Sequence, residues 1–216
     1  MAHRDDIKFI AVDGIVKRDN TALAKALSSA MHAESMLEEN AVTPMIDFQS
    51  SDPKDFLFKK HILRLIDRYK QQRQLRQTEI FYERVVTDYL FYTDRIYANL
   101  KLDSGDLQVY EALLDSMEKE LPIPDMVIYL QSNPETVIDK LATNYGLRGK
   151  HAIDAGYIQS LNDEFNQFFL HFAWSPVLIV NGNQFHPSDH RLTQDLLQKI
   201  LKHDGGIAYY NPPVME

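Results

Sequence analysis

Short apolar runs alternate with longer amphipathic stretches along this chain. Three of the runs are continuous and rich in β-branched residues, namely Lys8–Asp13, Asp125–Leu130 and Val177–Asn181. A fourth run, Glu83–Tyr89, is similar but more polar. Short, continuous apolar runs are typical of parallel strands that are buried on both faces. The pattern therefore predicts at least four strands of a parallel sheet.

The stretches between these strands carry apolar residues at helical spacing. The predicted helices are Thr21–His32, Pro53–Gln77, Asp106–Glu120, Pro134–Ala142, Ile158–Phe172 and Thr193–Lys202. Alternating strands and helices predict an α/β fold, a doubly wound sheet with right-handed crossovers. We expect a single domain over residues 1–203. Residues 204–216 are rich in Gly and Pro, so we expect them to form an extended C-terminal tail.

Composition narrows the class of protein. The chain has 216 residues, 44% of them hydrophobic and 25% charged, which is enough for one full core. Its net charge of -8 argues against a nucleic acid or an anionic membrane surface as the partner. It has no cysteine, so we expect no disulfide and a cytoplasmic protein. The charged start and the short apolar run Ile7–Val12 predict neither a signal peptide nor a membrane span.

The loop after the first strand lies where many α/β proteins bind phosphate. A phosphate-binding loop reads G-x-x-x-x-G-K-[ST], and its backbone N–H groups, lysine and hydroxyl hold the phosphates and magnesium. The loop expected here, Gly14–Thr21, keeps the first glycine and the last hydroxyl. Asp19 replaces the second glycine and Asn20 replaces the lysine. Asp19 adds a negative charge near the phosphates and Asn20 supplies no cation, so the loop alone indicates only an ordinary βα connection.

The rest of the chain carries a family resemblance. Its motifs are FIAVDG, TALAKAL, LEENAV, ILRLIDRYKQQ, VVTDYLFYTDRIYANLKL, LPIPDMVIYLQSNPETVIDKL, YIQSLNDEFNQFF and VLIVNGN, in that order over residues 8–183. Together they resemble the deoxynucleoside kinase family, especially its short bacterial deoxyadenosine and deoxyguanosine kinases. The resemblance implies a five-stranded parallel sheet of the P-loop kinase type, a deoxynucleoside pocket, a lid and usually a homodimer.

Four functional positions of that family are retained. Arg68 matches the arginine at the base and substrate pocket, and Asp94 matches the acid that contacts the base. Asp88 stands at the acid of the family's ERS-type motif, and Thr21 matches the hydroxyl that binds magnesium. The resemblance therefore implies that the nucleoside side of the site is largely kept.

Other family positions are changed. Asn20 stands for the loop lysine, and Ser35 stands at the catalytic base, with Glu34 and Glu38 close by. His61 stands for the glutamine that reads the base, and Tyr89 for the arginine of the ERS-type motif. In the lid, Tyr145 and Leu147 stand for two arginines and Lys150 for an acid, with Arg148 and Lys140 nearby but out of register.

These changes predict a protein that has lost phosphoryl transfer. That reaction depends on positioning and electrostatic stabilisation, and one clamp arginine or loop lysine contributes roughly 10³-fold or more in rate. We expect a pseudokinase with a binding or assembly role, as a homodimer or a subunit of a complex, and no required cofactor. A small nucleoside would contact His61, Arg68 and Asp94. Vestigial phosphate-binding positions would be Gly14, Lys17, Asn20, Thr21 and Arg148.

Two alternatives stay open. One is an active, atypical kinase that binds ATP and magnesium and phosphorylates the 5'-hydroxyl of a purine deoxynucleoside, with Lys17, Arg18 or Arg148 as substitute cations. The other is a metal site at His186 and His190, four residues apart. Since Pro187 interrupts the pair and a third ligand is lacking, we expect a solvated loop there and no metal site.

Overall fold

A six-stranded parallel sheet organises the molecule, for which the computed structural model describes residues 7–38, 54–75, 83–146 and 153–213. In spatial order its strands are β2 (Glu34–Met36), β3 (Val85–Thr87), β1 (Phe9–Asp13), β4 (Met126–Gln131), β5 (Val177–Asn181) and β6 (Ile207–Tyr210). All neighbouring strands pair in parallel. The predicted doubly wound α/β class is confirmed, with six strands in place of five.

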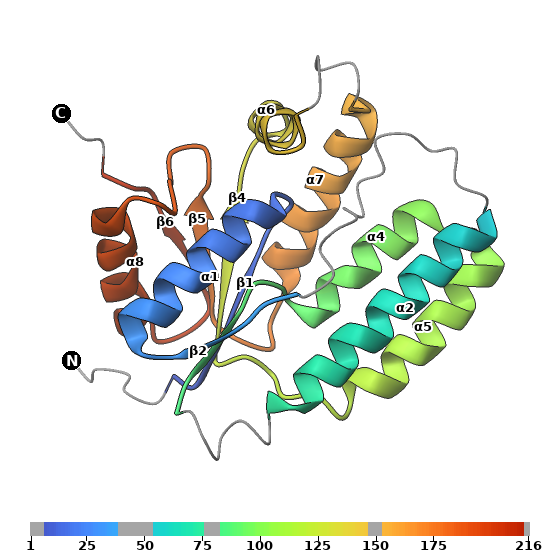
Figure 1. Cartoon of the computed structure of the whole chain (residues 1–216), viewed down its shortest axis with the longest axis horizontal. Helices are drawn as coiled ribbons and strands as arrows, with labels where there is room; N and C mark the ends of the chain where they lie inside the picture. The colour runs from blue at the N-terminus through green and yellow to red at the C-terminus, as the bar shows by residue number, and fades with distance from the viewer. Residues whose placement is uncertain (1–6, 39–53, 76–82, 147–152, 214–216) are drawn as a thin grey trace.

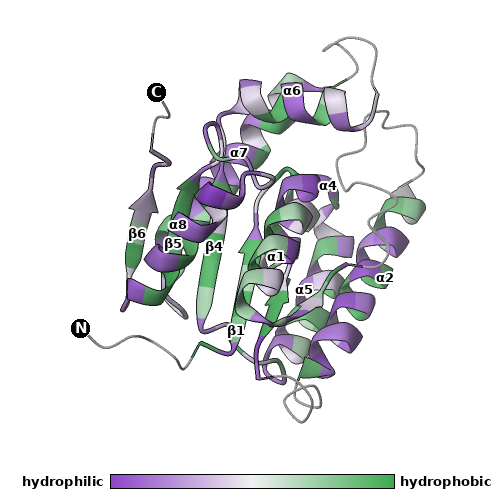
Figure 2. Ribbon diagram, turned by 60° about the vertical axis from the view of Figure 1, so that its left-hand side comes forward, coloured by the Kyte–Doolittle hydropathy of each residue, from purple (hydrophilic) through white to green (hydrophobic). Residues whose placement is uncertain are grey.

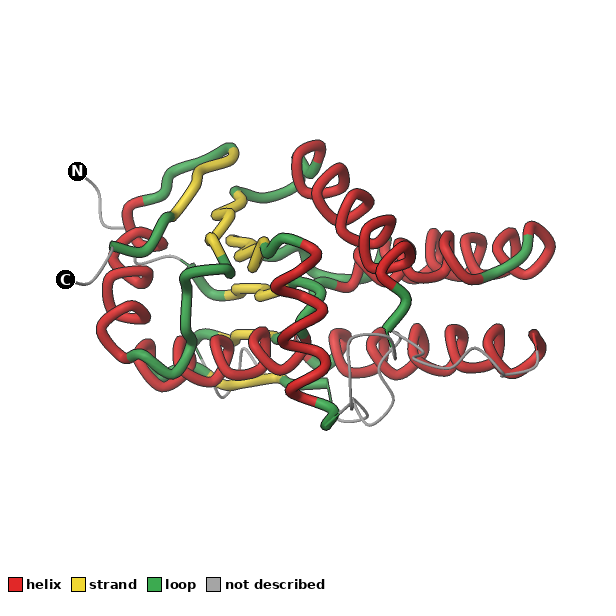
Figure 3. Tube along the Cα trace, turned by 90° about the horizontal axis from the view of Figure 1, so that it is seen from above, coloured by secondary structure: helices red, strands yellow, loops and turns green. Residues whose placement is uncertain are grey.

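Helices cover both faces of the sheet (Figures 1 and 3). They are α1 (Lys17–Met31), α2 (Lys54–Arg73), α4 (Asp94–Lys101), α5 (Ser104–Glu118), α6 (Pro134–Asn144), α7 (Ala155–His171) and α8 (His190–Lys202), with a short 3-10 turn, η1 (Phe91–Thr93). Helices α1 and α8 pack together on one face, and α4 and α7 pack together on the other. Helices α2 and α5 pair with each other and with α4. No helix in the described part of the chain is long and apolar enough to cross a membrane.

The alternation of side chains along each strand builds two cores. Ile10 and Val12 of β1 face α1 and α8, whereas Phe9 and Ala11 face α4 and α7. Strands β1, β4 and β5 are mostly hydrophobic, as Figure 2 shows by hydropathy, and they are buried at nearly every position, so on both faces. This double burial is why the strands read as continuous apolar runs in the sequence.

Helix α1 begins earlier than its sequence predicts. The expected eight-residue loop is reduced to Gly14–Val16, and Lys17 is already helical. The backbone N–H groups of Asp19 and Asn20 donate to the Val16 carbonyl, at 2.9 and 3.2 Å. An acid in the first turn suits the positive end of a helix, so Asp19 favours this early start.

The segment that we expected to be an extended tail contributes a strand. Residues Ile207–Tyr210 pair with β5, and Tyr210 is buried against Phe185. The Tyr210 hydroxyl donates to Asp195 on α8 at 2.8 Å. The prediction of a tail that lies outside the core is therefore wrong for these residues, because one buried tyrosine and the ladder to β5 hold them.

Candidate functional site

Charged side chains converge at the carboxyl ends of β1, β2 and β3. Open α/β sheets bind their ligands at this edge. The group, which we call the charged cluster, consists of Asp13, Lys17, Glu38, Arg64, Arg68, Asp88 and Asp94. Strand ends supply the carboxylates of Asp13, Glu38 and Asp88. Helices α1, α2 and α4 supply the remaining members.

Glu38 lies at the centre of the charged cluster. Its Oε1 accepts hydrogen bonds from Nε of Arg64 and from Nε of Arg68, both at 2.9 Å. The Lys17 ammonium lies 3.1 Å from Oε2. Burial by itself would raise the pKa of the Glu38 carboxyl, but the charges of Arg68, Arg64 and Lys17 hold it well below its usual range. Glu38 is therefore ionised near neutral pH, and its charge faces these three cations.

Arg68 connects Glu38 to the acid of α4. Its Nη1 lies 3.3 Å from Oδ1 of Asp94, and Tyr110 donates to the other Asp94 oxygen at 2.8 Å. Burial by itself would lower the pKa of Arg68, but Glu38 and Asp94 raise it above its ordinary value. The three residues predicted to contact a nucleoside lie near one another, because the buried His61 ring packs edge-on against Tyr110.

Asp88 holds the start of α1 against the end of β3. Its Oδ2 accepts from the Thr21 hydroxyl at 2.5 Å, and its Oδ1 lies 2.9 Å from the Lys17 ammonium. The backbone N–H of Glu38 also donates to Oδ1, at 2.9 Å. The ammonium of Lys17 further donates to the Asp88 carbonyl oxygen at 2.8 Å. Lys17 is thus held between two carboxylates of its own chain.

Tyr89 fills the place that the resemblance gives to an arginine. The side chain is buried, and its hydroxyl donates to Gln71 at 2.9 Å. The Arg68 guanidinium lies over its ring, 4.6 Å from the centroid, a favourable cation–π contact. Burial raises the pKa of Tyr89, so the ring stays neutral. The charge that an arginine would direct at a phosphate is replaced by a packing surface for Arg68.

Asp13 is buried beneath the charged cluster. Its carboxylate accepts from the backbone N–H of Gly14 at 2.7 Å and of Leu90 at 2.9 Å, and from the Thr93 hydroxyl at 2.5 Å. Burial raises the pKa of this carboxyl, against the opposing charge of Arg68. Asp13 therefore ties the end of β1 to the turn that leads into α4, which places Asp94.

The segment that should bind phosphate is occupied by its own side chains. The Asn20 amide donates to the Gly14 carbonyl at 2.8 Å and is buried. Asp19 is paired with Lys140 of α6 at 2.7 Å, and this ammonium also donates to the Gly182 carbonyl. A Cβ at residue 14 would lie 2.7 Å from the Leu130 carbonyl oxygen, so only glycine fits there. Lys140 thus ties the first turn of α1 to the loop after β5.

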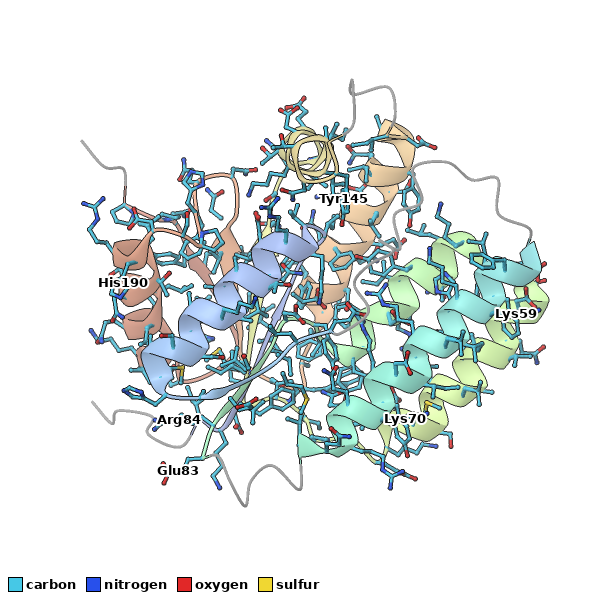
Figure 4. All side chains as sticks on the ribbon, in the orientation of Figure 1. Lys59, Lys70, Glu83, Arg84, Tyr145 and His190 are labelled. Carbon is cyan, nitrogen blue, oxygen red and sulfur yellow. The ribbon has the colours of Figure 1, made fainter. Side chains whose placement is uncertain are left out.

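The remaining predicted positions are outside the charged cluster or outside the described residues. Ser35 is in β2, where it pairs in register with Val86, and its described contacts include none with the cluster. Tyr145 is at the C-terminal end of α6, half-exposed (Figure 4). Leu147, Arg148 and Lys150 lie outside the described residues. In the structure Arg18 contacts Asn144 of α6 at 3.4 Å.

The resemblance implies two cofactors, Mg²⁺ and ATP, and the residues present at the site fit the two unequally. Thr21 and Asp88 offer the hydroxyl and carboxylate oxygens that Mg²⁺ prefers. The ammonium of Lys17 already neutralises that carboxylate, and its charge opposes a second cation. The segment after β1 fits the phosphates of ATP poorly, since Asp19 is anionic and two of its amides are used within the first helical turn.

Sequence reasoning missed three of the residues that shape this region, namely Glu38, Arg64 and Lys140 in their observed roles. Arg64 and Arg68 are one helical turn apart on α2, a spacing that puts both on one face. That spacing was a signal for a shared anionic partner. The sequence could not show which of the nearby acids it was, because residues far apart in the chain make the pairing.

Comparison with known proteins tests the family resemblance. A family model described as "Deoxynucleoside kinase" matches residues 10–203. A deoxyadenosine kinase of Dictyostelium discoideum is 26% identical over 186 residues, 82% of this chain and 73% of that protein. A deoxyguanosine kinase of Bacillus subtilis is 25% identical over 160 residues, 73% of this chain and 76% of that protein.

Solved structures of a deoxyadenosine kinase have a fold similar to that of this chain. The structure of deoxyadenosine kinase from M. mycoides with bound dATP has a TM-score of 0.69 and 23% identity to this chain. The match extends over 99% of the kinase chain and 90% of this chain. The structure of the same kinase with bound dCTP has a TM-score of 0.68 and 21% identity to this chain. That match extends over 98% of the kinase chain and 90% of this chain. At these identities the likeness concerns the fold.

Proposed function

Because the chain belongs to the deoxynucleoside kinase family, we propose that it is a pseudokinase of that family, with a binding or assembly role and no phosphoryl transfer. One observation carries the proposal: the segment Gly14–Thr21 is bonded to itself and to its neighbours where phosphates would have to enter. Asn20 is turned onto Gly14, and Asp19 is paired with Lys140. Of the two cations in this segment, Lys17 is held by Glu38 and Asp88, whereas the exposed Arg18 contacts the uncharged Asn144 of α6.

The charge balance of the neighbouring cluster supports the same proposal. Its three cations, Lys17, Arg64 and Arg68, all contact the single carboxylate of Glu38. A phosphate or a substrate hydroxyl would have to displace Glu38 before it could reach them. Breaking a buried ion pair costs about 3–5 kcal/mol, which is comparable with the binding energy of a weak ligand. A resting state of this kind disfavours turnover.

Calorimetry with Mg-ATP tests the phosphate side directly. We expect no measurable heat of binding for the wild-type protein up to millimolar ATP. The double variant Asp19→Gly with Asn20→Lys restores the glycine and lysine of the family motif and frees Lys140. We expect this variant to bind Mg-ATP measurably. Tight binding by the wild-type protein, in the micromolar range, would contradict the proposal.

Exposed apolar side chains support an assembly role. Phe56 and Leu63 are two turns apart on α2, and Val109 lies on the adjoining α5; all three are at least half-exposed. Such residues are typical of protein interfaces when they gather on one face. We propose that the α2–α5 pair contacts a second copy or another subunit. Analytical ultracentrifugation of Leu63→Arg beside the wild-type protein tests this, and an unchanged mass for an oligomeric wild-type protein would contradict it.

A second candidate, an atypical kinase, is favoured by the pair Thr21 and Asp88. These residues keep the family's magnesium-binding types and touch at 2.5 Å. In such an enzyme Lys17 would leave Glu38 and Asp88 and turn toward the phosphates. Replacement of Lys17 by Met would then abolish turnover, whereas in a pseudokinase it changes stability alone. An activity assay on this variant separates the two candidates.

A further inference from the structure

A second polar region lies at the other half of the same sheet edge, where β4, β5 and β6 end. A pocket of about 330 Å³ opens there, a volume within the range of small-molecule sites. Its walls come from the β4–α6 connection, α7, the β5–α8 loop and β6. None of its lining residues belongs to the charged cluster or to the segment Gly14–Thr21. We call it the amide pocket.

The lining of the amide pocket is polar but uncharged. Half of its twelve lining residues are asparagines: Asn133, Asn162, Asn166, Asn181, Asn183 and Asn211. The others include Gln131 and two tyrosines, Tyr209 and Tyr210, and no Asp, Glu, Lys, Arg or His. With Gln131, seven side-chain amides line this one pocket. Of these Asn162 is buried, and a buried amide is costly unless it is hydrogen-bonded.

The inner wall is a continuous hydrogen-bonded network. The Tyr129 hydroxyl and the Gln131 amide both donate to the Asn166 oxygen, at 2.9 and 2.7 Å. Asn166 donates to Asn162 at 2.8 Å, and Asn162 donates to the Ser132 carbonyl at 2.7 Å. Each amide is thereby fixed in one orientation. Fixed amides present donors and acceptors in a defined pattern, which is the arrangement that a specific site requires.

The outer rim is held in the same way and retains unused groups. The Asn183 oxygen accepts from the backbone N–H of Asn133 at 3.0 Å, and Asn181 donates to Asn211 at 3.1 Å. Within the described chain, the side-chain Nδ2 of Asn183 donates to no protein group, and Oε1 of Gln131 accepts from none. A donor and an acceptor therefore remain for a ligand in the pocket.

One exposed aromatic ring completes the rim. Tyr209 of β6 lines the pocket, yet 62% of its surface is exposed. A large exposed ring beside a polar pocket has no role in the core, whereas it offers a flat face for stacking. It comes from the strand that the sequence alone did not predict.

We propose that the amide pocket binds a neutral, planar ligand whose edge carries both hydrogen-bond donors and acceptors, namely a nucleobase or an unphosphorylated nucleoside. Asparagine and glutamine amides match such edges in pairs, as they do for adenine. Tyrosine stacks on base faces with little preference for sequence. The uncharged lining disfavours nucleotides, whose phosphates would lack a cation. This site is separate from the nucleoside position of the charged cluster and does not depend on the proposed loss of activity.

Ligand-observed NMR and calorimetry test the proposal with adenine, cytosine, adenosine and cytidine as probes. Ribose, glucose and dATP serve as comparison ligands. We expect the bases and nucleosides to bind with a Kd of roughly 10 µM to 1 mM, and the comparison ligands at least tenfold more weakly. Binding of the sugars in preference to the bases would overturn the ligand class, and absence of any binding at 5 mM, about five times the weakest expected Kd, would overturn the site.

Two variants locate the binding. Asn183→Asp keeps the oxygen that accepts from Asn133 but replaces the free donor by a charged acceptor, and Tyr209→Ala removes the stacking face. Both residues are exposed, so we expect both variants to fold. We expect each to weaken base binding at least tenfold. Matched controls are Asn99→Asp on α4 and Ile123→Ala in the connector before β4, both exposed and outside the pocket. Equal binding by the pocket variants and the controls would contradict the proposal.

Discussion

The two halves of the sheet's carboxyl edge hold their polar residues in opposite ways. At β1, β2 and β3, four carboxylates and three cations are packed together, and each cation meets a carboxylate of the same chain. At β4, β5 and β6, uncharged amides surround about 330 Å³ of space. The first half balances its charges within the chain, whereas the second keeps a donor and an acceptor unused. The difference teaches that matching the residue types of a family's site does not fix what those residues contact.

The physical basis of the comparison is the cost of burial. A buried charge is stable only when an opposite charge and hydrogen bonds compensate it, and here Glu38 compensates both Arg68 and Arg64. A buried amide needs only hydrogen bonds, which neighbouring amides or a neutral ligand supply equally well. The following changes break or sharpen this contrast, in order of expected effect.

Replacement of Arg68 by Met has the largest expected effect. It leaves the buried Asp94 and Glu38 with one cation fewer, which should lower the free energy of unfolding by about 3–5 kcal/mol. Chemical denaturation measures this. The control is Arg95→Met, which removes a looser, exposed pair with Glu111 at 3.9 Å and should cost under about 1 kcal/mol. Equal, small effects of the two changes would show that the charged cluster does not hold the structure.

Replacement of Asn162 by Ala breaks the network of the amide pocket. The buried Asn162 bridges Asn166 and the Ser132 carbonyl, so its loss should cost about 1–3 kcal/mol. Because no charge is involved, the cost should be the same at low salt and at 1 M salt. Asn99→Ala, at an exposed position of α4, is the control and should cost under about 0.5 kcal/mol. A marked salt dependence of the Asn162 effect would remove the distinction between the two halves.

Glu38→Gln tests the charged half of the sheet edge through the pH dependence of the free energy of unfolding. The pKa of Glu38 is depressed in the folded state, so its charge adds stability above the ordinary glutamate pKa of about 4.3 and loses it as pH falls below that value. Below about pH 5, unfolding free energy should therefore fall more steeply for the wild type than for the variant, by up to about 1.4 kcal/mol per pH unit. Parallel curves between pH 5 and 3, about the window in which an ordinary glutamate titrates, would contradict the assignment.

Lys140→Met gives the smallest expected effect. Lys140 joins Asp19 to the Gly182 carbonyl, but both side chains of the ion pair are partly exposed, so the loss should be about 1 kcal/mol or less. Thermal unfolding measures the change beside Lys25→Met, an exposed control on α1. We also expect faster hydrogen exchange of the backbone around Gly182, and unchanged exchange there would show that Lys140 does not tie the two segments together.

The sequence predicted best where burial is uniform. Strand β5 was predicted to the residue, because Val177–Asn181 is apolar on both faces. Helix α4 was missed because it is only eight residues long and follows directly on the buried turn Phe91–Thr93. Strand β6 was missed because three of its four residues are at least partly exposed and two glycines precede it.

The candidate site was predicted only in part for a different reason. Arg68, Asp88 and Asp94 were identified from the family resemblance, and the structure brings them together. The role of Glu38 could not be read from the sequence, because it depends on Lys17 and Arg68, which lie 21 positions before it and 30 after it in the chain. The amide pocket has the same origin: its walls come from the β4–α6 connection, α7, the β5–α8 loop and β6, which are far apart in the chain. Long-range pairing of polar groups leaves no local pattern.

Transfer of labelled γ-phosphate from ATP to each of the four deoxynucleosides, in the presence of Mg²⁺, tests the central claim most directly. The account predicts no transfer above the rate without protein. It also predicts that Asp19→Gly with Asn20→Lys alone does not restore transfer, because Tyr89 and Ser35 still replace two groups of the family's site. Wild-type turnover of about 0.1 s⁻¹ or more, a tenth of the low end of ordinary enzyme rates, would contradict the account.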